Sequence, residues 1–196
     1  MPLNPEADPD VQLMLAVQRG DRSAFGQLFE KHVRGVVGFA AQFVGARARA
    51  EELAQDVFLQ IYRTRARYVP TARFTTWLYR MVTNACLSEV RRADHRSRIL
   101  PVDHAVERDD ADPGSLPEVA TRSSEEVVLS QESLNRLRTE LEELPPQQRA
   151  ALLLARVEGL SYEEVAEALS SSVSAVKSLV HRATVRLRDR MQEEHK

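Results

Sequence analysis

Apolar residues spaced three and four positions apart recur along most of this chain. Two stripes cover about 48–63 and 74–92, with Pro70 between them, and an earlier one covers 21–44 and contains Phe25, Leu28, Phe29, Val36, Ala40 and Phe43. This spacing matches the 3.6-residue turn of a helix rather than the two-residue repeat of a strand. The sequence therefore predicts an all-α fold.

The first part of the chain is expected to form one small helical domain. A short helix near Val11 to Arg19 precedes the three stripes, and Asp21 is placed to cap the helix that follows. Together these helices predict a four-helix domain over 11–98. Residues 1–10 are predicted to be an acidic tail.

An acidic segment over 99–132 separates this domain from the rest of the chain. It contains Pro101, Pro113 and Pro117, and residues 103–132 carry 9 acidic but only 2 basic side chains. By contrast, residues 11–102 carry 15 basic and 7 acidic side chains, so the formal net charge of -2 hides a basic domain. The segment is predicted to be a flexible linker that acts as a self-repelling, extended tether.

The last part of the chain, 133–196, has the pattern of a helix-turn-helix domain. A helical pattern resumes around Ser124, breaks at Pro145-Pro146 and continues over 147–157. Ser161 and Glu164 form a capping box, and a serine turn over 170–172 leads into a basic helix predicted over 173–191. A short helix, a tight turn and a longer basic helix are typical of DNA-binding proteins.

One face of this last helix carries hydrogen-bond donors. Rotation by 100° per residue places five side chains away from the apolar stripe: Ser174, Lys177, Ser178, His181 and Arg182. Hydroxyl, ammonium and guanidinium groups suit phosphates and base edges. From the residue types alone, an ordinary solvated basic face explains the pattern equally well.

Other classes of protein are disfavoured by what the sequence lacks. Cys86 is the only cysteine, which excludes an intramolecular disulfide and a multi-cysteine zinc site. The histidines show no metal-ligand spacing and no phosphate-cradling glycine loop occurs, so we expect no enzyme, no metal and no cofactor. No apolar run is long enough to cross a membrane, and we expect a cytoplasmic protein without membrane insertion.

Three motifs, in order, resemble the extracytoplasmic-function (ECF) group of bacterial sigma factors. They are Ala48-Arg49-Ala50-Glu51-Glu52-Leu53-Ala54-Gln55-Asp56-Val57-Phe58-Leu59, then Phe74-Thr75-Thr76-Trp77-Leu78-Tyr79-Arg80-Met81-Val82-Thr83-Asn84-Ala85-Cys86 with Glu89-Val90-Arg91-Arg92, and finally Leu144-Pro145-Pro146-Gln147-Gln148-Arg149, Leu160-Ser161-Tyr162-Glu163-Glu164-Val165-Ala166, Val176-Lys177-Ser178 and His181-Arg182-Ala183. The resemblance implies a sigma region 2-like domain followed by a sigma region 4-like domain, which direct transcription initiation.

The resemblance also implies a role for each surface. Docking on core RNA polymerase would use Glu52, Gln55, Asp56 and Leu59. Promoter DNA at the minus 10 element would be bound by Tyr68, Arg73, Phe74, Arg80, Asn84, Arg91 and Arg92, with Trp77 expected in the core. The outward face of the last helix would read the minus 35 element, and an anti-sigma factor would be a further partner. The resemblance also implies that the acidic linker runs toward the active cleft of the polymerase, where it would mimic nucleic acid rather than act only as a tether.

Two positions depart from the family pattern. Leu179 stands where an arginine is common, which removes one phosphate or base contact, and the 170–172 turn has serines where a glycine is usual. The main alternative is a conventional helix-turn-helix regulator that binds DNA without joining core polymerase. A helical enzyme and a protein-interaction adaptor are further alternatives.

Overall fold

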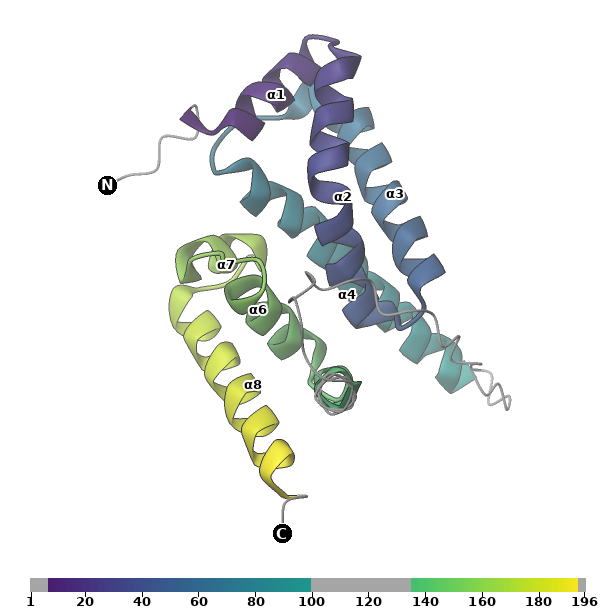
Figure 1. Cartoon of the computed structure of the whole chain (residues 1–196), viewed down its shortest axis with the longest axis vertical. Coiled ribbons are helices and arrows are strands. Elements are labelled where there is room, and N and C mark those ends of the chain that lie inside the picture. Colours follow the sequence, from purple (N-terminus) through teal and green to yellow (C-terminus); the bar gives the residue numbers. More distant parts are fainter. Residues whose placement is uncertain (1–6, 100–134, 194–196) are drawn as a thin grey trace, which may run out of the picture.

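The structure, a computed structural model, describes residues 7–99 and 135–193, and every regular element in these two ranges is helical (Figure 1). This confirms the predicted all-α class. In chain order the elements are α1 (Pro9–Gln18), α2 (Arg22–Val44), α3 (Arg47–Thr64), the 3₁₀ helix η2 (Arg65–Arg67), α4 (Phe74–Ile99), α6 (Pro146–Arg156), α7 (Tyr162–Ala168) and α8 (Val173–Glu193). Residues 135–142 form a further helical stretch before α6.

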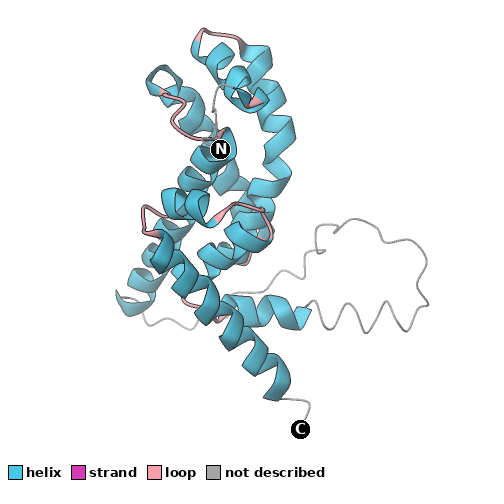
Figure 2. Ribbon diagram, turned by 90° about the vertical axis from the view of Figure 1, so that its left-hand side faces the viewer, coloured by secondary structure: helices cyan, strands magenta, loops and turns pink. Residues whose placement is uncertain are grey.

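The helices form two groups that lie against each other. α1 to α4 make the N-terminal body, and α6 to α8 make the C-terminal body, whose α6 and α7 contact α4 (Figures 1 and 2). The predicted linker lies outside the described residues apart from its first residue, Ile99, and so does the helical pattern around Ser124. Within the described ranges, no helix is long and apolar enough to cross a membrane.

Two predicted helix starts are confirmed by their capping bonds. The Asp21 carboxylate accepts hydrogen bonds from the backbone N–H groups of Ser23 (2.8 Å) and Ala24 (3.1 Å). In the capping box of α7, Ser161 Oγ accepts from the Glu164 N–H (3.2 Å), while Glu164 Oε2 accepts from the Ser161 N–H (2.8 Å). Each bond satisfies an N–H that the helix itself leaves unpaired.

The first helix begins earlier than the sequence predicted, and residues 8–10 belong to the N-terminal body rather than to a tail. Asp8 caps α1 and also accepts a hydrogen bond from the Phe74 N–H at the start of α4 (3.0 Å). Asp10 is buried and paired with Lys31 (2.7 Å) and His32 (2.9 Å) on α2. A buried carboxylate needs such partners, so these two acidic residues tie α1 to α2 and α4.

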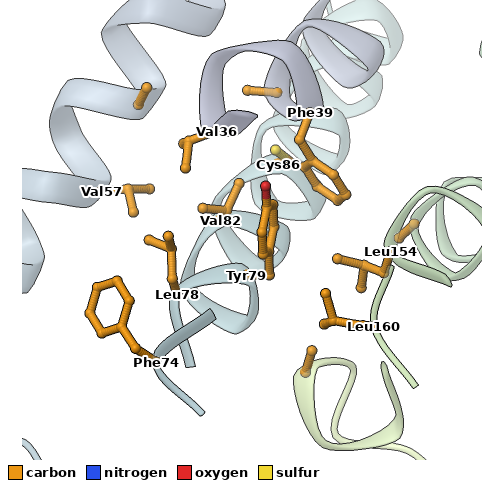
Figure 3. Packing of buried hydrophobic residues seen from close by; sticks show 14 of the residues in the cluster. Val36, Phe39, Val57, Phe74, Leu78, Tyr79, Val82, Cys86, Leu154 and Leu160 are labelled. Carbon is orange, nitrogen blue, oxygen red and sulfur yellow. The ribbon is translucent and has the colours of Figure 1, made fainter. Parts of the chain in front are cut away.

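The hydrophobic core continues from one body into the other. Figure 3 shows the α4 residues Phe74, Leu78 and Val82 packed under α2, with Tyr79 on the side of α4 that faces Leu154 and Leu160 of the C-terminal body. Cys86 is fully buried, and burial raises the pKa of its thiol to about 12. The apolar stripes predicted from the sequence therefore do line the core.

The turn between α7 and α8 closes without a glycine. Ser170 has φ 49°, and it is the non-glycine residue with positive φ in the described ranges. Its N–H donates to the Glu167 carbonyl (3.1 Å), and the Ser171 N–H donates to the Ala166 carbonyl (2.8 Å). These two bonds are the Schellman arrangement that usually places glycine at the left-handed position.

We predict that Ser170→Gly raises the free energy of unfolding by about 0.5–1 kcal/mol, because glycine removes the steric cost of the left-handed conformation. Urea unfolding followed by circular dichroism measures the change. Ser171→Gly is the matched control, and we expect it to leave stability unchanged or to lower it slightly, because Ser171 does not have a positive φ. Equal effects of the two substitutions would show that the Ser170 conformation carries no strain.

Candidate protein and nucleic-acid interfaces

The outer face of α3 carries the four side chains predicted to dock on a protein partner. Glu52, Gln55, Asp56 and Leu59 are all exposed, because the opposite stripe of the helix is buried in the core. Leu59 is a large apolar side chain that is 44% exposed. An apolar residue flanked by carboxylates and an amide is the mixed surface expected of a protein interface.

The structure adds an apolar groove on one side of this face. Gln55 and Leu59 border it, and its floor is made of aromatic rings from α2 and α3: Phe25, Phe29, Phe58 and Tyr62. The rings pack closely, with centroids 5.0 Å apart for the Phe25–Tyr62 pair and 4.9 Å apart for the Phe29–Phe58 pair. The sequence placed Phe25 and Phe29 in the core stripe, and only the packing of α2 on α3 leaves them half-buried beside the docking face.

Asp56 lies on the other side of this face, along a polar groove between α3 and α4. Glu89 holds this groove together through Arg49 (3.1 Å), Arg96 (3.4 Å) and Arg92 (3.5 Å). Partial burial opposes ionisation of Glu89, but the hydrogen bonds and charges of these arginines outweigh it and lower the pKa of the carboxyl. Three of the four predicted docking residues therefore border two chemically different grooves, Gln55 and Leu59 the apolar one and Asp56 the polar one.

The predicted minus 10 residues divide into an exposed set and a buried pair. Arg80, Asn84, Arg91 and Arg92 are exposed on α4, as expected of backbone contacts, and Arg73 is exposed at the start of that helix. Arg92 also lies within 3.5 Å of Glu89, and Arg73 within 3.7 Å of Glu164 on α7. Some of the proposed DNA-binding cations therefore have an internal acidic partner.

Tyr68 and Phe74, which are also predicted to bind the minus 10 element, are buried. The exposed fraction is 5% for Tyr68 and 0% for Phe74. Trp77 packs against both rings, with its ring centroid 4.9 Å from that of Tyr68 and 5.9 Å from that of Phe74. Burial, together with the charge of Asp8, raises the pKa of Tyr68 to about 12. In this arrangement neither ring offers a free face for stacking, because the apolar stripe of α4 includes Phe74 and the loop folds Tyr68 onto Trp77.

The predicted DNA-reading face of α8 is present as one exposed surface. Ser174, Lys177, Ser178, His181 and Arg182 are exposed, while Val176, Val180 and Ala183 on the opposite side are buried. Ser178 Oγ donates to the Ser174 carbonyl (3.1 Å), and Ser174 Oγ lies 3.1 Å from Ser172 Oγ, so both hydroxyls have a partner within the chain. Lys177 and Arg182 form no ion pair with a described residue. Their charges are thus available to an anion.

Leu179 is half-buried at the edge of this face and packs against the core. Leu179 therefore contributes to packing at the position where the family commonly has an arginine. Among the described residues, no group of three histidine, cysteine or acidic side chains is placed to hold a metal ion. The chemistry offered by these surfaces is binding through charge, hydrogen bonds and apolar contact.

Comparison with known families finds two matches, one on each body. Residues 28–96 match the family described as Sigma-70 region 2, and residues 134–187 match the family described as Sigma-70, region 4. The RNA polymerase sigma-H factor of Pseudomonas aeruginosa is 32% identical over 178 residues, which is 90% of each chain. The RNA polymerase sigma factor CarQ of Myxococcus xanthus is 35% identical over 175 residues, covering 89% of this chain and 92% of CarQ.

Two solved structures share the fold. CnrH in complex with the cytosolic domain of CnrY gives a TM-score of 0.69 at 22% identity, covering 94% of this chain and 98% of CnrH. The sigma factor RpoE from Bartonella quintana, in complex with the anti-sigma factor NepR, gives a TM-score of 0.66 at 20% identity. The match covers 86% of this chain and 97% of RpoE.

Proposed function

Because this chain belongs to the ECF group of the sigma-70 family, we propose that it binds core RNA polymerase and directs it to promoters through two DNA elements. The observation that carries this proposal is the order of the two family matches, region 2 on the N-terminal body and region 4 on the C-terminal body. Relatives named as RNA polymerase sigma factors match over about nine-tenths of the chain. No catalytic step is assigned to this chain.

The docking surface for core polymerase is the outer face of α3. Gln55 and Leu59 supply an amide and an apolar contact beside the aromatic groove, while Glu52 and Asp56 supply charge. Buried apolar anchors surrounded by polar groups are what carry affinity in protein interfaces. Phe25 and Tyr62 extend this surface onto the groove floor.

The two DNA-binding surfaces lie on α4 and α8. Arg80, Asn84, Arg91 and Arg92 on α4 are suited to the sugar-phosphate backbone at the minus 10 element, with Arg73 at the start of the helix. The exposed face of α8 is suited to the major groove at the minus 35 element. Tyr68 would contact bases only after the loop between η2 and α4 moves, and Phe74 only after the start of α4 leaves the core.

An anti-sigma factor is the expected inhibitory partner, since both structural relatives are solved with a partner protein and one of those partners is named as an anti-sigma factor. Such a partner would act by covering the surfaces that core polymerase and DNA need. We propose a cytoplasmic location, where these partners act.

Size-exclusion chromatography of the purified chain with bacterial core RNA polymerase tests the proposal. We expect a stable complex that elutes with core polymerase and contains one copy of this chain. A chain that stays free of core polymerase while it retains duplex DNA alone would instead support a conventional helix-turn-helix regulator.

A further inference from the structure

One end of the N-terminal body carries a patch of arginines. The end of α1, the start of α2 and the helix η2 meet there (Figure 1). Residues 18–22 and 65–73 together contain five arginines and one acidic residue, Asp21. Four of the arginines form what we call the arginine patch: Arg19, Arg22, Arg65 and Arg67. The fifth is Arg73, next to the start of α4.

The Gln18 side chain fixes Arg19 beside η2. Its amide donates to the backbone carbonyls of Ala66 and Tyr68, at 3.1 Å each. Ala66 is the central residue of η2. These two hydrogen bonds therefore hold the end of α1, where Arg19 lies, against η2 and the loop that follows it.

Tyr62 brings the other part of the patch together. Arg22 and Tyr62 line the same apolar groove. The guanidinium carbon of Arg65 lies 4.2 Å from the centroid of the Tyr62 ring, and Arg65 Nη1 donates to the Tyr62 carbonyl at 2.7 Å. A guanidinium held over a ring in this way is a platform on which an unstacked base can lie.

The charge of the arginine patch is not neutralised within the described residues. Five other arginines of this body each lie within 3.7 Å of a carboxylate: Arg47, Arg49, Arg73, Arg92 and Arg96. The four patch arginines form no ion pair with a described residue. The Asp21 carboxylate is used to cap α2. The patch is therefore available to an anionic ligand.

The chemistry of the patch favours a single strand of nucleic acid over a duplex. Its cations come from helix ends rather than from one helix that could enter a major groove. An apolar side chain, Val69, is 65% exposed in the loop after η2. Proteins that bind single strands combine cations for the phosphates with apolar or flat surfaces for unstacked bases.

The patch also continues the proposed minus 10 surface. The exposed cations of that surface follow α4 and end at Arg73, just before the helix begins. The loop 68–73 connects this point to η2 and Arg67. A strand that is opened along α4 and leaves at the start of this helix therefore meets the arginine patch next.

We propose that the arginine patch binds single-stranded DNA where the opened strand of the promoter leaves the start of α4. Arg19, Arg22 and Arg67 contact phosphates, and Arg65 supports one base. The use of the patch in an open promoter rests on the proposed function, whereas the binding of a single strand by the free chain does not.

Binding of an oligothymidylate of about twelve nucleotides, a length that one small domain can cover, tests this assignment on the full chain. Arg19→Ala together with Arg67→Ala removes two charges from the patch. Arg34→Ala together with Arg47→Ala is the matched control, because it removes the same charge from exposed positions elsewhere on this body. Fluorescence anisotropy at several salt concentrations gives the affinity and its salt slope.

We expect the patch variant to bind the oligothymidylate at least about tenfold more weakly than the control variant does. The slope of log affinity against log salt should fall by about 0.7 for each phosphate contact that is lost. Binding to a duplex of oligothymidylate and oligoadenylate should weaken less. Affinity for core polymerase should be the same in both variants, because neither patch position borders the grooves of the docking face.

Equal affinity of the two variants for the oligothymidylate, equal losses on single strand and duplex, or no binding by the unchanged chain would overturn the assignment. A patch variant that keeps its affinity for the oligothymidylate but loses core polymerase would also overturn it, since the patch would then be a protein-docking surface. Absence of core binding by every variant contradicts the proposed function alone, because the oligothymidylate measurement needs only the free chain.

Discussion

Replacing Gln55 and Asp56 together by alanine is expected to lower the affinity for core RNA polymerase by at least about tenfold. Both side chains are exposed on α3, and each borders a different groove, so the double change affects both halves of the docking face. Neither side chain supports the core. The loss should therefore come from missing contacts with the partner rather than from unfolding.

Fluorescence anisotropy of labelled chain titrated with core polymerase measures this loss. Gln27→Ala together with Glu30→Ala is the matched control, because it removes one amide and one carboxylate from exposed positions on α2. The control should bind like the unchanged chain. Equal affinity of both double variants and the unchanged chain would place the docking surface elsewhere.

Replacing Lys177 and Arg182 together by alanine is expected to weaken binding to minus 35 duplex DNA by at least about tenfold. Both side chains lie on the exposed face of α8. Each phosphate contact that is lost should also lower the slope of log affinity against log salt by about 0.9. The double variant should therefore bind more weakly and depend less on salt.

Binding of the full chain with core polymerase to promoter duplex, measured at several salt concentrations, tests this prediction. Arg138→Ala together with Arg156→Ala is the matched control, because it removes the same amount of positive charge from exposed positions outside α7 and α8. If that control loses as much affinity and slope as the Lys177 and Arg182 variant, the contribution of α8 is only general positive charge.

Local sequence rules predicted the helices well because the relevant interactions are local. The Asp21 cap and the Ser161–Glu164 box lie within three residues of their partners, and the apolar stripes fix which side of each helix is buried. The exposed face of α8 followed from the same periodicity. The early start of α1 was missed although its signals are local, since Asp8 caps the helix and Pro9 occupies its first turn.

Features that depend on contacts between distant segments were outside the reach of the sequence. Glu164 was identified as a capping residue, but its bond to Thr76 joins positions 88 residues apart. The aromatic groove beside Leu59 requires α2 packed on α3, and the burial of Tyr68 requires the loop folded onto Trp77. Periodicity tells which face is apolar and leaves open what packs against it.

Transcription from a randomised promoter library tests most directly whether this chain is a sigma factor. Core polymerase is supplied with templates randomised over the 40 or so base pairs upstream of a fixed run-off cassette, with and without the purified chain. We expect run-off RNA only when the chain is present, from templates enriched in two sequence elements near minus 10 and minus 35. RNA output equal to that of core polymerase alone, together with tight binding of the chain to duplex DNA, would contradict it.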